Sequence, residues 1–151
     1  MQINMLPVAF VCNNRSEAID DNWKEIISEI TLANNIPEEA FNNISSFSHL
    51  EIIFFFDKVK EEDVVFHGHP RGNNNYPDCG IFVQRKKDRP NKIGICTVEL
   101  IKHEGKTITV KYLDAIDGTP VLDIKPVIKQ FQPQKEIMQP QWVDELMKNY
   151  W

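Results

Sequence analysis

Apolar residues in this chain occur in short runs separated by polar residues, a pattern that suits β-strands and leaves little room for long helices. The longest run, Ile52–Phe56, is too short to cross a bilayer. With the residues before it, this run predicts an aromatic and β-branched strand at His49–Phe56, which we expect to be buried on both faces. Alternation places Ile26, Ser28, Ile30 and Leu32 on one face of another strand. Further strands are expected at Leu6–Val11, Cys79–Gln84, Ile93–Ile101, Thr107–Leu113 and Pro120–Ile124.

Turn and helix signals complete the fold prediction. HEGK at residues 103–106 favours a hairpin turn, with Gly105 suited to the tight bend. Pro37 and the two acids after it are typical of a helix start, and Pro140–Trp151 places apolar residues on one helical face. The class is therefore mostly β, a small closed or nearly closed β-barrel with short peripheral helices. We expect the barrel domain at residues 1–130 and a C-terminal, helical extension at residues 131–151.

Composition indicates a globular protein whose cysteines are reduced. It has 151 residues, 42% of them apolar and 26% charged, which fits one domain. The first residues lack the basic segment of a secretory signal. Three cysteines at wide spacings fit reduced thiols better than disulfides or a zinc ribbon. Reduced thiols predict a cytoplasmic protein. His67 and His69 lack a third ligand, so we expect no metal.

Charge is unevenly distributed along the chain. The net charge is −5, yet residues 84–92 carry five basic residues and one acid, Asp88. This segment could contact a phosphate-bearing partner or form a solvated basic loop, and charge alone does not decide between them. Neither a glycine-rich dinucleotide loop nor a P-loop is present, so a nucleotide-like cofactor would need another kind of site.

Four ordered motifs resemble one known family. They are RPNKIGICTVELI (residues 89–101), LDAIDGTPVLDIKP (113–126), FSHLEIIFFF (47–56) and FVQR (82–85). Together they resemble the TsaA-like (TrmO) family of tRNA methyltransferases. The resemblance implies a small β-barrel that binds S-adenosylmethionine, generally as a homodimer. It also implies methylation of N6 of threonylcarbamoyladenosine beside the tRNA anticodon.

The resemblance also implies a set of cofactor-binding residues. The FSHL element supplies His49 and Leu50, and the FVQR element supplies Arg85. The D-G-T-P turn supplies its four residues, Asp117–Pro120. A loop at residues 21–24 falls where the family has a P-R-Q segment, although its residues differ. The expected cofactor ligands are Asn22, Trp23, His49, Leu50, Arg85, Ile95, Asp117, Gly118, Thr119 and Pro120.

Physical roles follow from the cofactor's chemistry. Arg85 could clamp its carboxylate, and Asp114 or Asp117 could offset its amino group or sulfonium. Backbone groups of Ile95 and the turn at Gly118 could bind the adenine edge, and no residue is assigned as a base. Local alternatives stay open: the turn could be an ordinary hairpin, and His49 could be a hydrogen-bonded core residue.

The substrate prediction depends on the basic segment. Phosphate contacts are expected from Lys86, Lys87, Arg89 and Lys92. The chain departs from the family here, with KKDRPNKIG in place of SPFRPNPIG, and it lacks the arginine of V-R-S at Val11–Asn13. Two alternatives are a non-catalytic S-adenosylmethionine-binding protein and a methyltransferase for a small molecule. Aromatic residues at Phe54–Phe56 and in the segment from Trp142 to Trp151 are expected to supply dimer surface.

Overall fold

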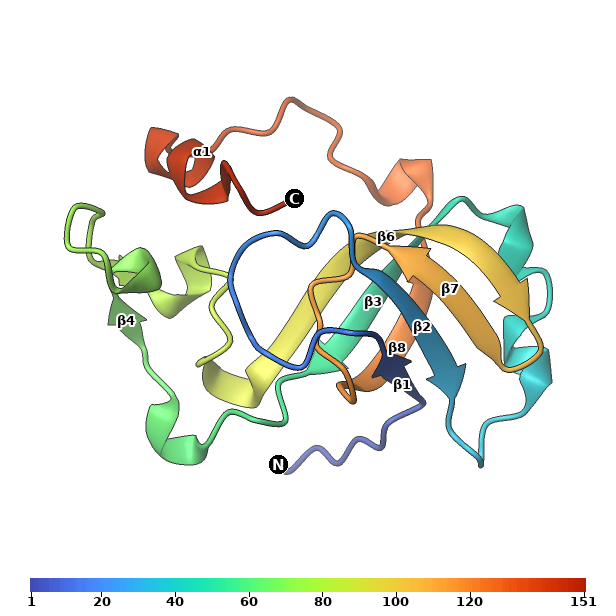
Figure 1. The fold of residues 1–151 in the computed structure, drawn as a ribbon. Coiled ribbons are helices and arrows are strands. Elements are labelled where there is room, and N and C mark those ends of the chain that lie inside the picture. The colour runs from blue at the N-terminus through green and yellow to red at the C-terminus, as the bar shows by residue number, and fades with distance from the viewer.

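A closed six-stranded antiparallel barrel forms the body of the protein in the computed structural model, which describes residues 1–151 (Figure 1). Pairing of β8 with both β3 and β1 closes the ring. This architecture confirms the fold class predicted from the sequence. Around the barrel the strands are β1 (Ala9–Cys12), β2 (Ile27–Leu32), β7 (Thr107–Lys111), β6 (Ile93–Glu104), β3 (His49–Phe55) and β8 (Pro120–Pro126).

The core lies inside the barrel and follows the alternation of the strands. In β2 the side chains of Ser28, Ile30 and Leu32 are buried, as predicted. In β3 only alternate residues are buried, with Ile52 and Phe54 inside. The expectation that both faces of this strand are buried is wrong, because alternate residues of a barrel strand face outward.

β6 and β7 form the predicted hairpin, with Gly105 in its turn at φ 56°. β6 is longer than its partner, since β7 ends at Lys111 opposite Glu99. The part of β6 before Glu99 therefore pairs with β3 alone. Tyr112 then adopts φ 66°, an uncommon conformation for a bulky residue, and turns the chain out of β7.

A long connection, residues 56–92, links β3 to β6 and projects from one side of the barrel (Figure 1). It contains a small sheet of β4 (His67–Gly68) and β5 (Cys79–Gly80). The strand predicted at Cys79–Gln84 is wrong beyond Gly80, because residues Ile81–Val83 form a 3-10 turn. That turn buries Ile81 and leaves Phe82 exposed.

Helical structure is sparse. The helix start predicted at Pro37 leads only to a 3-10 turn, whereas the C-terminal segment forms α1 (Gln141–Met147), the one α-helix. No helix has the length and apolar character needed to cross a membrane. The 3-10 turns are Glu38–Phe41, Ile44–Ser46, Glu61–Asp63, Pro70–Gly72, Ile81–Val83, Pro90–Lys92 and Lys129–Phe131.

Candidate functional site

The D-G-T-P turn is bonded to the end of β1. The backbone N–H of Gly118 donates to the Val11 carbonyl at 2.8 Å, and that of Asp117 donates to the Arg15 carbonyl at 2.8 Å. One Asp117 carboxylate oxygen accepts from the Asn13 N–H at 3.0 Å. Gly118 has φ 79°, which favours glycine. The turn lies within the β7–β8 connection and does not join two paired strands, so the simple hairpin alternative is wrong.

Thr119 and Pro120 continue this turn into the barrel wall. Thr119 is only 4% exposed, and its carbonyl accepts from the Val11 N–H at 3.0 Å. Pro120 is the first residue of β8 and pairs in register with Phe10 of β1. The structure therefore places the four motif residues where β1 pairs with β8.

Arg15 organises the loop that follows β1, and the sequence reasoning missed it. Its guanidinium donates to the carbonyls of Ile19 at 2.6 Å and Asp21 at 2.7 Å, and lies 3.7 Å from the centre of the Trp23 ring. Trp23 is 4% exposed and Asn22 has φ 65°. A lone arginine before an acidic loop gives no sequence signal for this role, because its partners are backbone carbonyls.

Arg85 and Asp114 both lie near the part of β6 that pairs with β3 alone. The Arg85 guanidinium donates to the carbonyl of Ile95, so these two predicted residues are brought together. Beside them, one Asp114 oxygen accepts from the Tyr150 hydroxyl at 2.5 Å, and the other is buried without a hydrogen-bond partner. Such an atom is costly to leave unpaired, so it marks a place for a donor.

Electrostatics link the groups near this part of β6. Burial, and then the negative charge of Asp114, raises the pKa of the Cys96 thiol and of the Tyr150 hydroxyl. The positive charge of Arg85 lowers the pKa of both groups, but by less than burial and Asp114 raise it. The Cys96 thiol also lies 2.9 Å from the Tyr112 carbonyl. Both groups therefore stay protonated near neutral pH and can act as donors.

His49 lies in an open pocket of about 450 Å³ on the outer face of the barrel. Its side chain is exposed, with one ring nitrogen 2.8 Å from the Ser48 hydroxyl, so the core-histidine alternative is wrong. The side chain of Leu50 is 1% exposed and points into the barrel core, away from this pocket. The pocket is lined by Lys24, His49, Thr97, Glu99, Tyr112 and Trp151.

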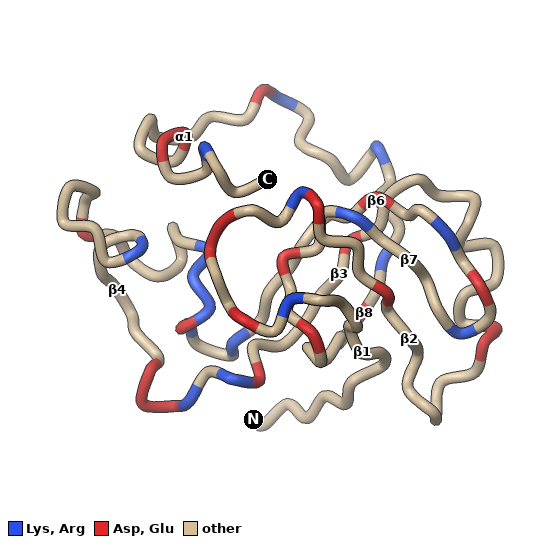
Figure 2. Tube along the Cα trace, in the orientation of Figure 1, with Lys and Arg blue, Asp and Glu red and all other residues tan.

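The basic segment is partly neutralised by its own contacts. Figure 2 shows its basic and acidic residues in the projecting connection. Lys86 and Lys87 both pair with Asp88, at 3.4 and 2.7 Å, and remain partly exposed. Arg89 donates to the Gln84 carbonyl at 2.9 Å. Lys92 pairs with Glu61, and its side chain is 14% exposed.

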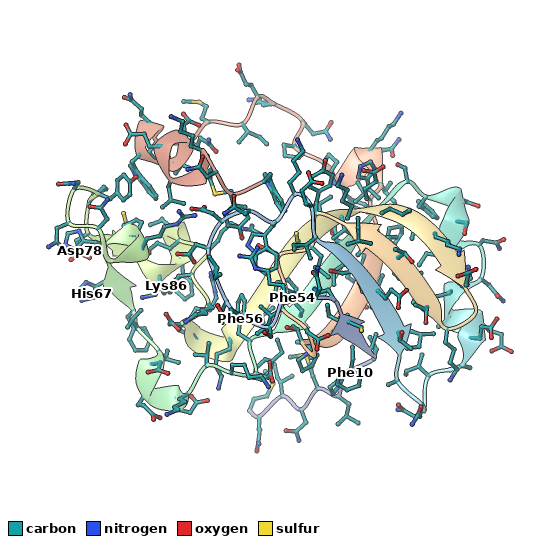
Figure 3. The ribbon with its side chains drawn as sticks, viewed as in Figure 1. Phe10, Phe54, Phe56, His67, Asp78 and Lys86 are labelled. Carbon is teal, nitrogen blue, oxygen red and sulfur yellow. The ribbon has the colours of Figure 1, made fainter.

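The two histidines of the connection have separate partners. His67 lies 3.1 Å from the Asp78 carboxylate, and both side chains point outward near β4, away from the barrel (Figure 3). His69 lies 2.7 Å from the Tyr76 carbonyl. No group of three or more potential metal ligands is present.

Comparison with known proteins identifies the family. Residues 19–132 match the tRNA-methyltransferase O N-terminal domain, and the chain belongs to this family. A probable S-adenosyl-L-methionine-binding protein of Methanothermobacter thermautotrophicus is 34% identical over 132 residues, covering 83% of this chain and 90% of the relative. The tRNA (adenine(37)-N6)-methyltransferase of Homo sapiens is 37% identical over 106 residues, covering 70% of this chain and 24% of the human protein.

Other relatives differ more in length. A probable S-adenosyl-L-methionine-binding protein of Pyrococcus abyssi is 31% identical, and the match covers 66% of this chain and 52% of the relative. The chain therefore spans about half the length of that protein and about a quarter of the human one. The crystal structure of TrmO from Pseudomonas aeruginosa has the same fold, with a TM-score of 0.76 and 22% identity over 94% of this chain and 62% of the other.

Proposed function

We propose that the protein is an S-adenosylmethionine-dependent methyltransferase that acts on N6 of threonylcarbamoyladenosine in tRNA. The observation that carries the proposal is that Arg85 and the buried, unpartnered oxygen of Asp114 both lie near Cys96 of β6. Tyr150, the partner of Asp114, is followed by Trp151, which lines an open pocket. Membership of the tRNA-methyltransferase O family and the names of the relatives supply the reaction class.

Arg85 and Asp114 fit the charges of the cofactor. S-adenosylmethionine supplies the methyl group from a sulfonium and carries a carboxylate, an amino group and an adenine. Arg85 would bind the carboxylate through N–H groups that Ile95 does not use, and Asp114 would accept from the amino group or face the sulfonium. The backbone around Gly118 leaves room for close approach, since a Cβ there would meet nothing within 4 Å.

Catalysis would depend mainly on positioning. Positive charge on sulfur decreases during methyl transfer, so the protein has no new charge to stabilise at that atom. In-line alignment of acceptor and methyl group and exclusion of water are the larger contributions. No residue is assigned as the proton acceptor.

Cofactor binding is the first test. Calorimetry with S-adenosylmethionine should show binding, and Arg85→Ala should weaken it by about 1.5–3 kcal/mol because a charge-assisted hydrogen bond is lost. Lys58→Ala is the control, since Lys58 is an exposed cation paired only with its neighbour Asp57. Equal affinity of wild type and Arg85→Ala would remove Arg85 from the site, and no heat from the wild type would reject the cofactor itself.

The tRNA substrate is tested by salt dependence. Lys86→Ala with Lys87→Ala should weaken tRNA binding and flatten its salt dependence by up to about two units of slope, because each phosphate contact contributes about one. Cofactor affinity should stay unchanged. Lys92 is left in place, since its pairing with Glu61 would make its removal a change of structure as well. An unchanged slope would place tRNA elsewhere on the surface.

A second candidate function is a non-catalytic S-adenosylmethionine-binding protein. Two relatives carry that description without a named reaction, which favours it as the alternative. A small-molecule methyltransferase is also compatible with a net charge of −5. Transfer of labelled methyl groups to bulk tRNA, followed by nucleoside analysis, separates the main proposal from the other two. Label in the modified adenosine supports the main proposal, and cofactor binding without transfer to tRNA supports the other two.

We also propose a homodimer, which light scattering tests. The aromatic residues predicted to supply its surface are mostly used within one chain: Phe54 is buried in the core, and Tyr150 and Trp151 pack against the barrel. Exposed Phe66 and Phe82 in the projecting connection support the dimer instead. A cytoplasmic location and the domain boundary at residue 130 stay predictions; the family match ends nearby, at residue 132.

A further inference from the structure

The segment Asn149–Trp151 returns from α1 to the barrel and lies against the loop that follows β1. The backbone N–H of Asn22 donates to the Asn149 carbonyl, and that of Trp23 donates to the Tyr150 carbonyl, both at 2.9 Å. In Figure 1 the end marked C lies beside this loop, above β6. The segment lies outside residues 19–132, which match the family.

Tyr150 anchors this segment to Asp114. Its hydroxyl donates to one oxygen of Asp114, whose other oxygen is the buried, unpartnered atom described above. Burial raises the pKa of Tyr150, so the hydroxyl remains a donor throughout the physiological range. The contact restrains the Asp114 carboxylate and leaves its other oxygen, which has no hydrogen-bond partner, able to accept from another group.

Trp151 forms a wall of the pocket that contains His49. Its ring contacts the Tyr112 ring edge to face, with centroids 5.5 Å apart, and the Tyr150 ring at 5.0 Å. Trp151 remains 44% exposed, so part of its surface faces open space. Lys24, Thr97 and Glu99 supply polar groups to the same pocket. Aromatic faces with a few polar groups are the usual composition of a site for a planar base.

We infer that Asn149–Trp151 forms part of the cofactor site. Trp151 supplies a stacking surface for the adenine of S-adenosylmethionine, and Tyr150 positions Asp114 to face the sulfonium of that cofactor. This inference rests on the proposed function. It adds two residues that neither the sequence motifs nor the family match includes. The pocket volume of about 450 Å³ is sufficient for a nucleoside-sized group.

The test compares the cofactor affinity of Trp151→Ala, Trp151→Phe and wild type by calorimetry. Loss of a base–aromatic stack should weaken S-adenosylmethionine binding roughly five- to 150-fold in Trp151→Ala, with partial recovery in Trp151→Phe, which keeps a ring. Trp142→Phe is the matched control, because Trp142 lies in the same C-terminal region but packs on Tyr76. It should leave the affinity unchanged.

Intrinsic fluorescence provides a readout that does not depend on activity or on the alanine variant folding. Cofactor binding should quench indole emission in wild type and in Trp142→Phe, and the quenching should be clearly smaller in Trp151→Phe, which keeps only Trp23 beside the Asn149–Trp151 segment. Cofactor binding of equal strength and equal quenching in Trp151→Phe would overturn the inference while leaving the proposed function intact. Loss of tRNA affinity alone in Trp151→Ala would also overturn it, since the stacked base would then belong to the substrate. A wild type that does not bind S-adenosylmethionine would reject both proposals.

Tyr150 is tested as a positioning residue. Tyr150→Phe keeps the ring but removes the hydroxyl that holds Asp114, so it should weaken binding of S-adenosylmethionine more than binding of its uncharged-sulfur product, S-adenosylhomocysteine. Equal loss for both ligands would overturn a role of Asp114 at the sulfonium, because both ligands carry the amino group and only S-adenosylmethionine carries the sulfonium. No loss for either ligand would exclude Tyr150 from the site.

Discussion

The barrel and the connection at residues 56–92 are held together by different kinds of contact. Fifteen buried residues form one continuous core in the barrel. The connection buries Val59, Pro70 and Ile81, and otherwise relies on polar contacts such as those from Gln84 to the carbonyls of Gly68 and Cys79, both at 2.9 Å. Because apolar burial is shared among many strands while these contacts are local, the connection should open without unfolding the barrel. Arg85 and the basic residues after it therefore lie on the part that we expect to open first.

The largest expected effect is a difference in thiol reactivity. Cys96 is buried in the barrel, and burial raises its pKa, so it should react with an alkylating reagent only on global unfolding. Cys79 is half-buried in β5 and should react after local opening. For a domain of ordinary stability this predicts labelling of Cys96 at least about a thousandfold slower than that of Cys79. Mass spectrometry of timed samples measures both rates, and equal rates would show that barrel and connection open together.

A second prediction concerns the close packing of Gly94 against Phe54 in the barrel. Gly94 of β6 pairs with Phe54 of β3, and a Cβ on Gly94 would lie 2.4 Å from the Phe54 ring. Gly94→Ala should therefore lower the free energy of unfolding by about 1–3 kcal/mol through overpacking. Urea unfolding measures this. Gly80→Ala in β5 is the control, since a Cβ there meets nothing within 4 Å. Similar stability of both variants would contradict the contrast between the two regions.

The smallest effect is expected where the connection contacts the loop after β1. Arg71 makes two hydrogen bonds to the Asp21 carboxylate, at 3.1 and 2.7 Å, and both side chains are 27% exposed. Asp21→Asn should lower the free energy of unfolding by about 1 kcal/mol or less, because solvent screens a partly exposed pair. Hydrogen exchange should show faster exchange in the connection alone. Faster exchange throughout β3 and β6 would mean that this ion pair supports the barrel.

Part of the candidate site could be predicted from the sequence. The ordered motifs located Arg85, Ile95 and the D-G-T-P turn, and the structure joins Arg85 to Ile95 by a hydrogen bond. Arg15 escaped prediction because its partners are backbone carbonyls, which no residue pattern reveals. Trp151 could not be predicted as a pocket residue, because its place in the pocket depends on the path of the chain after α1.

By itself, the sequence determined the strands and the barrel they build. Apolar and polar residues alternate along each strand, and this alternation is a local property of each segment. It also determined the turn at Gly105, where a positive φ favours glycine. Only the tertiary structure decided which oxygen of Asp114 lacks a partner and that Tyr150 holds the other. These features depend on side chains that are far apart in the chain and meet only when the barrel closes, so no local pattern encodes them.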